Sequence, residues 1–146
     1  NSEVNFRVEL GLSIIETHNF VLGNVSIPVQ FSSQGLQLDA EESIEVLPFR
    51  AVLQSRFNEG INLDFINSIN VYLIDPDGLR RRELFYLDFV PFGRKEEIEL
   101  IPTLVNIFDL VENDQAVIEV SLDLRQFPPQ SFEMLLDMQF SGFLIE

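Results

Sequence analysis

The sequence predicts an all-β fold: a two-sheet antiparallel β-sandwich of immunoglobulin-like or related Greek-key topology, with residues 1–146 forming a single domain. First, large apolar residues occupy every second position from Phe132 to Phe140, which places them on one face of a strand. Second, this alternation recurs in seven or eight segments separated by turn residues. Third, 146 residues without a repeat or linker suit one domain that buries roughly 70% of its unfolded surface. A closed barrel is the structural alternative.

The expected strands follow one another with turn signals between them. Pro28 has no N–H for a ladder and predicts an edge position or a bulge, and Pro48 predicts a break or a switch between sheets. Asp75, Pro76, Asp77 and Gly78 form a strong turn signal. The expected strands are residues 4–10, 25–31, 44–57, 68–73, 84–90, 98–100, 118–124 and 132–140, with an acidic loop over 39–45 and an irregular turn over 62–67.

One short helix is expected near residues 103–111. Thr103 is a suitable capping residue, and Asn113 and Asp114 would end the helix. Four apolar residues then recur at helical spacing, which would place them on one face. They are Leu104, Ile107, Phe108 and Val111.

The charge balance restricts the partners of this chain. It has 24 acidic and 9 basic residues, a formal net charge of −15. This charge repels nucleic-acid phosphates and anionic membranes, so we expect no nucleic-acid partner. Solubility explains the charge, and halophilic adaptation or recruitment of divalent cations are alternatives. The basic runs at residues 80–82 and 94–95 are interpreted as solvated loop charge.

The aromatic and sulfur residues indicate how the core is built. No cysteine is present, which excludes disulfides and thiolate chemistry. Fourteen Phe stand against two Tyr and no Trp, a set suited to packing rather than to carbohydrate stacking. We interpret the Phe residues as core. The alternative is an exposed Phe-lined groove that binds an apolar ligand or a partner protein.

No residue is assigned a catalytic role. His18 is expected in a loop as an ordinary polar residue, because no nucleophile motif accompanies it. The carboxylates show no spacing typical of an acid and base pair. We therefore predict that the protein is not an enzyme. A hydrolase on the same scaffold is the alternative, which would need a cleft with a perturbed carboxylate or His18 beside a nucleophile.

No metal or cofactor site is predicted either. Asp75 and Asp77 are explained by the turn, and the spacing of a calcium loop stops after Gly78. Weaker candidates are Asp39, Glu41 and Glu42. A calcium-dependent ligand-binding domain is the alternative. The glycosylation pattern at Asn24, Val25 and Ser26 is discounted because it begins an expected strand.

The ends and hydropathy of the chain bear on its location. No apolar run approaches the length of about 20 residues that crosses a bilayer. The chain begins at Asn1 without Met, which predicts a processed product. We expect a signal segment before Asn1 that ends in a lipid-bearing Cys, so membrane contact is expected only through that anchor outside this chain.

About two thirds of the chain resembles uncharacterised exported proteins and lipoproteins of the bacterial cell envelope. The resemblance covers the stretch from Leu63 to Leu73, a turn, a short strand, the segment from Thr103 to Leu110 and the closing strand. The resemblance implies a location in the envelope, periplasmic or anchored to the outer membrane, or secretion. It also implies a non-enzymatic binding or structural module, whose partner would be an unidentified protein or an apolar ligand.

Overall fold

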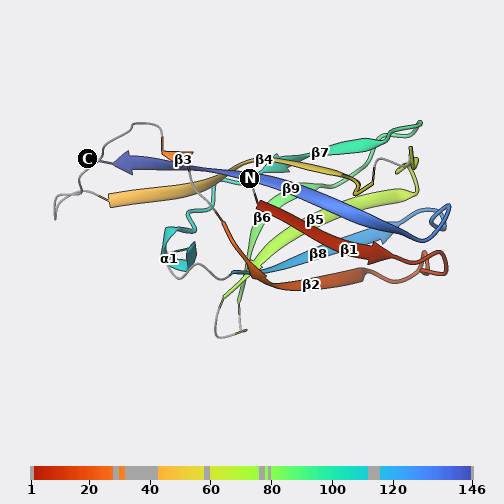
Figure 1. Ribbon diagram of the computed structural model, residues 1–146, viewed down its shortest axis with the longest axis horizontal. Coiled ribbons are helices and arrows are strands. Elements are labelled where there is room, and N and C mark those ends of the chain that lie inside the picture. The colour runs from red at the N-terminus through yellow and green to blue at the C-terminus, as the bar shows by residue number, and fades with distance from the viewer. Residues whose placement is uncertain are drawn as a thin grey trace.

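The computed structural model describes residues 2–27, 30–31, 43–57, 60–75, 78, 80–111 and 116–145. These residues form nine strands and one short helix (Figure 1). The elements are β1 (Ser2–Val8), β2 (His18–Val25), β3 (Gln30–Phe31), β4 (Ser43–Ser55), β5 (Ile66–Ile74), β6 (Arg81–Leu87), β7 (Glu97–Pro102), α1 (Phe108–Val111), β8 (Ala116–Leu124) and β9 (Phe132–Ile145).

The strands pair along one continuous path, in the order β1-β9-β4-β7-β6-β5-β8-β2, with every pair in that path antiparallel. β3 pairs in parallel with β9. The two ends of the path, β1 and β2, also contact each other, so the sheet is curled into a nearly barrel-shaped form. The all-β prediction is confirmed. Two separate sheets are not confirmed, because β7 pairs with β4 through Ile98 and Leu100 and with β6 through Ile101 and Pro102.

β9 is the strand that the sequence predicted most sharply, and it is internal to the sheet. It lies between β1, where Val8 is opposite Phe132, and β4, where Leu53 is opposite Leu136. Its alternating residues are all buried, which confirms the prediction of a common buried face. They are Phe132, Met134, Leu136, Met138 and Phe140.

The core lies inside the curl of the sheet and draws side chains from both halves of the path. Aromatic rings meet across it: Phe65 packs edge-on against Phe132 with ring centroids 6.1 Å apart, and Phe85 packs against Phe140 at 5.9 Å. Large side chains that are fully buried include Leu53, Leu63, Ile66, Ile69, Leu73, Leu84, Ile107, Ile118 and Leu122.

The interpretation of Phe as core filler is only partly confirmed. The buried rings are Phe6, Phe65, Phe85, Phe132 and Phe140. Among the described residues, Phe20 and Phe108 are partly buried and six others are exposed: Phe49, Phe57, Phe89, Phe92, Phe127 and Phe143.

The second expected strand is only partly confirmed. A strand was expected over 25–31, whereas β2 covers His18–Val25 and pairs with β8, so that Val25 and the two-residue β3 (Gln30–Phe31) are the described strand residues within the expected range. The alternation of β2 is hard to recognise in the sequence, because the apolar Val21 lies on its exposed face and Gly23 interrupts the apolar residues after Leu22. The register is irregular between Leu22 and Val25. Residues 28–29 lie outside the described residues, and the expected bulge at Pro28 with them.

Three other expectations need smaller corrections. The first strand ends at Val8, and Leu10 is exposed in the following connection. Pro48 precedes a register shift within β4, but the strand pairs with β9 on both sides of it, so no switch between sheets occurs there. The fifth strand begins three residues earlier than expected, at Arg81. The turn after β5 is confirmed by a hydrogen bond from Gly78 N to the Asp75 carbonyl at 2.8 Å.

The helix expected over 103–111 is limited to Phe108–Val111. The chain before it pairs with β4 instead of coiling: Ile107 N donates to the Val46 carbonyl, and Val46 N donates to Asn106 Oδ1. Asn106 Oδ1 also accepts from Phe108 N, so Asn106 caps the helix in place of Thr103. Leu104 is consequently 89% exposed. Within the described residues, no helix is long and apolar enough to cross a membrane.

Candidate binding surface at the loop end

Four connections lie at the same end of the curled sheet, on the right in Figure 1. They join β1 to β2 (residues 9–17), β4 to β5 (56–65, of which 58–59 lie outside the described residues), β6 to β7 (88–96) and β8 to β9 (125–131), and we call them the loop end. Hydrogen bonds tie them together. Leu63 N donates to the Lys95 carbonyl and Leu10 N to Ser131 Oγ, while Arg125 N donates to the Phe65 carbonyl. The loop end is therefore one connected surface.

Exposed apolar side chains gather at the loop end. It holds seven of the twelve large hydrophobic residues that are exposed in the described part of the chain. Ile15 and Phe92 are the most exposed of them, at 91% and 76%. A concentration of this kind on a folded protein marks an interaction surface more often than scattered single residues do. The seven are Leu10, Ile14, Ile15, Phe57, Phe89, Phe92 and Phe127.

Arg125 organises the centre of this surface. Its guanidinium donates to the carbonyls of Asp64 at 2.7 Å, Val90 at 2.5 Å and Pro91 at 3.3 Å. The same group lies over the ring of Phe92, 4.3 Å from its centroid, and 5.6 Å from that of Phe89. One cation thus connects three of the four connections and holds two aromatic rings.

Lys95 also fixes the tip of the β6–β7 connection. Its ammonium donates to the carbonyls of Pro91 at 2.5 Å and Gly93 at 3.2 Å. Gly93 has a φ of 114°, a conformation that other residues rarely adopt, so this tight turn requires glycine. The rings of Phe89 and Phe92 pack edge-on at 5.4 Å. The tip is therefore held in one shape before any partner arrives.

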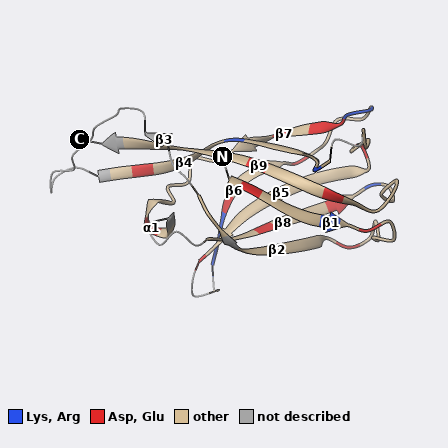
Figure 2. Cartoon of the chain, viewed as in Figure 1, with Lys and Arg blue, Asp and Glu red and all other residues tan. Residues whose placement is uncertain are grey.

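The loop end carries little of the negative charge of the molecule. The four connections contain six acidic and four basic residues, so their formal net charge is −2 out of −15 for the whole chain. Figure 2 shows acidic segments spread along the strands and a basic segment at the tip of the β6–β7 connection. The apolar surface is thus also the nearly neutral one.

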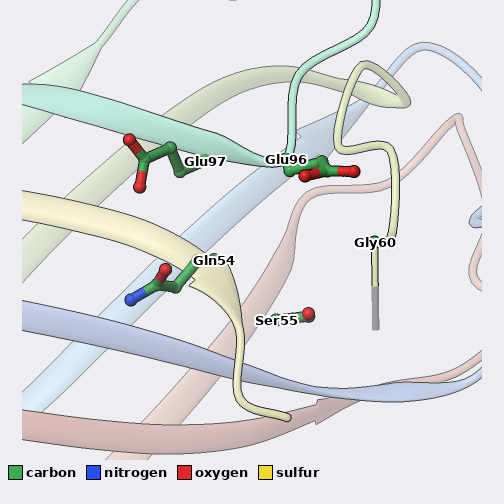
Figure 3. Close-up of a pocket in the computed structure, with 5 residues that line it drawn as sticks. All are labelled: Gln54, Ser55, Gly60, Glu96 and Glu97. Atoms are coloured by element: carbon green, nitrogen blue, oxygen red, sulfur yellow. The ribbon is translucent and has the colours of Figure 1, made fainter. Parts of the chain in front are cut away.

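A polar depression of about 250 Å³ lies at the edge of the loop end, between residues of the loop end and of β4 and β7 (Figure 3). Gln54, Ser55, Gly60, Glu96 and Glu97 line it. The carboxylates of Glu96 and Glu97 point in different directions, and Glu96 pairs with Arg94 at 3.3 Å. Glycoside hydrolysis requires two carboxylates that face the same reacting bond, and Glu96 and Glu97 do not have this arrangement.

His18 lies at the start of β2, and its expected placement in a loop is wrong. Its Nε2 is 2.7 Å from the carbonyl of Ser13, to which it donates because a carbonyl can only accept. This contact is to backbone, not to a hydroxyl nucleophile.

The residues around the turn at 75–78 form ion pairs. Asp75 is buried, and its carboxylate is 3.2 Å from Arg80 Nη2 and 3.4 Å from Arg82 Nε. Arg82 also binds Asp109 with two hydrogen bonds of 2.7 and 2.9 Å, which hold the pKa of Asp109 below its ordinary value.

Arg81 pairs with Glu119 at 3.0 Å and lies over the ring of Tyr72 at 4.3 Å. Burial and then the nearby Glu83 raise the pKa of Tyr72. The interpretation of residues 80–82 as solvated loop charge is therefore wrong for Arg81 and Arg82, which belong to β6 and cross-link it to its neighbours.

The candidate metal residues are only partly within the described chain. Asp75 already faces two guanidinium groups, while Asp77, Asp39, Glu41 and Glu42 lie outside the described residues. Among the residues that are described, no three His, Asp or Glu side chains are grouped so that they could hold a metal ion. The calcium alternative stays a prediction.

Sequence reasoning missed Arg125 and the aromatic residues around it. A signal was present: Phe92 stands between Pro91 and Gly93, and Phe127 precedes two prolines, so both rings occupy turns where no strand can bury them. The alternative of an exposed Phe-lined groove predicted the type of residue in this surface, but it did not predict which end of the fold the surface occupies.

Comparison with protein-family models, with curated proteins and with solved structures finds no match to this chain. These comparisons therefore assign no function to the chain.

Proposed function

We propose that this protein is a non-enzymatic binding module that contacts an apolar partner through its loop end. The observation that carries the proposal is the gathering of seven exposed apolar side chains on four connections that are tied to one another. Preformed surfaces bind more tightly than loose ones because less conformational entropy is lost on binding. The hydrogen bonds of Arg125 and Lys95 supply that rigidity.

The proposal includes a location in the bacterial cell envelope, as an anchored lipoprotein, or outside the cell. Support for it comes from the resemblance of the stretch from Leu63 to Leu73 and its following segments to exported proteins. We also propose that the two halves of the curled sheet act as the layers of an immunoglobulin-like β-sandwich. The ring contacts of Phe65 with Phe132 and of Phe85 with Phe140 across the core support this description.

Binding of Nile red tests the proposal, because this neutral dye reports apolar surface without responding to the charge of −15. The double variant Phe92→Ser/Phe127→Ser removes two exposed rings from the loop end. We expect dye binding to fall about threefold or more, since the variant removes two of the seven exposed apolar side chains there.

The matched control is the double variant Phe49→Ser/Leu104→Ser, which removes two exposed apolar residues outside the loop end. It should bind the dye like the unaltered protein. Equal losses in the two double variants, or none in the first, would show that the loop end is not the binding surface.

A further inference from the structure

We infer that the loop end binds by shallow insertion into the surface of an electrically neutral lipid bilayer, with Ile15, Phe92 and Phe127 entering the acyl boundary. This inference rests on the proposed function and names the partner of the same surface. It also departs from the expectation that only an anchor outside the chain would touch a membrane.

The uneven charge of the molecule favours this partner. The loop end has a formal charge of −2, which leaves −13 of the total of −15 on the rest of the chain. A neutral bilayer can accept the loop end while the acidic strands stay in water. An anionic bilayer would repel the body of the protein over roughly a Debye length, about 10 Å at 0.1 M salt.

Several backbone groups at the tip of the β6–β7 connection are already hydrogen-bonded, which lowers the cost of placing them in an apolar environment. Unpaired carbonyl groups are costly in lipid, because no water is present to bind them. Here the carbonyls of Val90, Pro91 and Gly93 accept hydrogen bonds from Arg125 and Lys95, and Pro91 has no N–H to satisfy. Val90 N donates to the Asn67 carbonyl at 2.8 Å.

The same contacts hold the Arg125 guanidinium against the rings of Phe92 and Phe89, and Arg125 is less exposed than either ring. Both rings are exposed. When the rings enter the acyl boundary, such a guanidinium lies at the depth of the lipid headgroups, where a charged group is tolerated.

The arrangement of the apolar residues suits a deformable surface. Ile15, Phe92 and Phe127 belong to three different connections, and Figure 1 shows the β6–β7 and β1–β2 connections at opposite corners of this end. A protein partner would need separate pockets to match them, whereas lipid fills the space around each side chain. The observations therefore favour lipid over a partner protein or a second copy.

Sedimentation with extruded vesicles tests the inference, since the chain has no Trp to report binding by fluorescence. We expect the protein to bind phosphatidylcholine vesicles. Including about 30% phosphatidylglycerol at low salt should weaken binding about threefold or more, and about 0.5 M NaCl should restore it, because the repulsion is electrostatic. The variant Phe92→Ser/Phe127→Ser should lose about tenfold in affinity, and Phe49→Ser/Leu104→Ser should bind normally.

Failure to bind phosphatidylcholine, or equal binding by both double variants, would overturn the inference. If vesicles do not bind but Nile red still distinguishes the two double variants, the lipid partner is wrong and the binding surface stands. Sedimentation velocity tests whether a second copy of the chain is the partner instead. If vesicles do not bind and the protein forms a dimer that the variant Phe92→Ser/Phe127→Ser dissociates, the loop end is a dimer interface. Circular dichroism confirms that each variant is folded.

Discussion

Arg125 shows how a single side chain shapes the candidate surface. It follows β8, yet its donors reach carbonyls in the β4–β5 and β6–β7 connections. A guanidinium presents several donors in a fixed plane and can stack on a ring at the same time, which a lysine ammonium cannot do. The position of Phe92 in space therefore depends on a residue that lies 33 positions later in the chain.

Replacing Arg125 by Gln should lower the free energy of unfolding by about 2–4 kcal/mol. The change removes charged hydrogen bonds and leaves carbonyls at the loop end without their donor. Arg50→Gln is the control, since Arg50 pairs with Glu99 on the surface with both side chains more than half exposed, and its loss should cost less than about 1 kcal/mol. Urea denaturation measures both, and similar losses would show that the contacts of Arg125 contribute no more than a surface pair.

Asp109 should make stability depend on pH. The hydrogen bonds from Arg82 lower the pKa of Asp109 below its ordinary value, so the native state favours the carboxylate. A group with a lowered native pKa stabilises the fold above its unfolded pKa, and this contribution disappears as the pH falls through the native pKa. Arg82 remains charged throughout.

The stability difference between the unaltered protein and Asp109→Asn should accordingly be constant from pH 7 to about 5 and shrink below about 4. Because the Asp109 side chain is 63% exposed, we expect a difference below about 1 kcal/mol. Urea titrations at several pH values measure it. A difference that grows in acid would contradict the assigned direction.

At the scale of elements, the strands with clean alternation were predictable and those set by tertiary pairing were not. β5, β8 and β9 alternate strictly enough that pattern alone located them. Leu104 and Ile107 have helical spacing in the sequence. In the structure, however, Ile107 N donates to the carbonyl of Val46 in β4 instead of forming a helical hydrogen bond. Local periodicity cannot report such a contact, because its partner lies about sixty residues earlier in the chain.

The burial of β9 predicts a sharp difference between two adjacent leucines. Leu136 is fully buried between β1 and β4, whereas Leu135 is on the opposite face and only partly covered. Leu136→Ala should lower the free energy of unfolding by about 2–5 kcal/mol, because it leaves a cavity in the core. Leu135→Ala, the matched control, should cost clearly less. Equal losses of stability for the two variants in urea denaturation would contradict the assignment of the Leu136 face of β9 to the core.

At the scale of the whole molecule, the sequence predicted an all-β fold but could not distinguish two separate sheets from one curled sheet. Alternation reports that one face of each strand is buried, and this holds in a sandwich and in a curled sheet alike. β7 joins the two halves of the sheet by pairing with both β4 and β6. The candidate surface was hidden for a related reason: Ile15, Phe92 and Phe127 lie on three connections that are distant in the sequence but share one end of the sheet.

The net charge of −15 governs how ions should affect the whole molecule. Screening relieves repulsion between carboxylates without choosing between ions of equal charge, so calcium and magnesium at the same millimolar concentration should raise the melting temperature equally, by a few degrees at most. Asp75 is not available as a ready ligand, because Arg80 and Arg82 already neutralise it. Thermal scans with each ion measure the effect. A rise selective for calcium and abolished by Asp77→Ala would establish a calcium site at the turn after β5 and contradict this expectation.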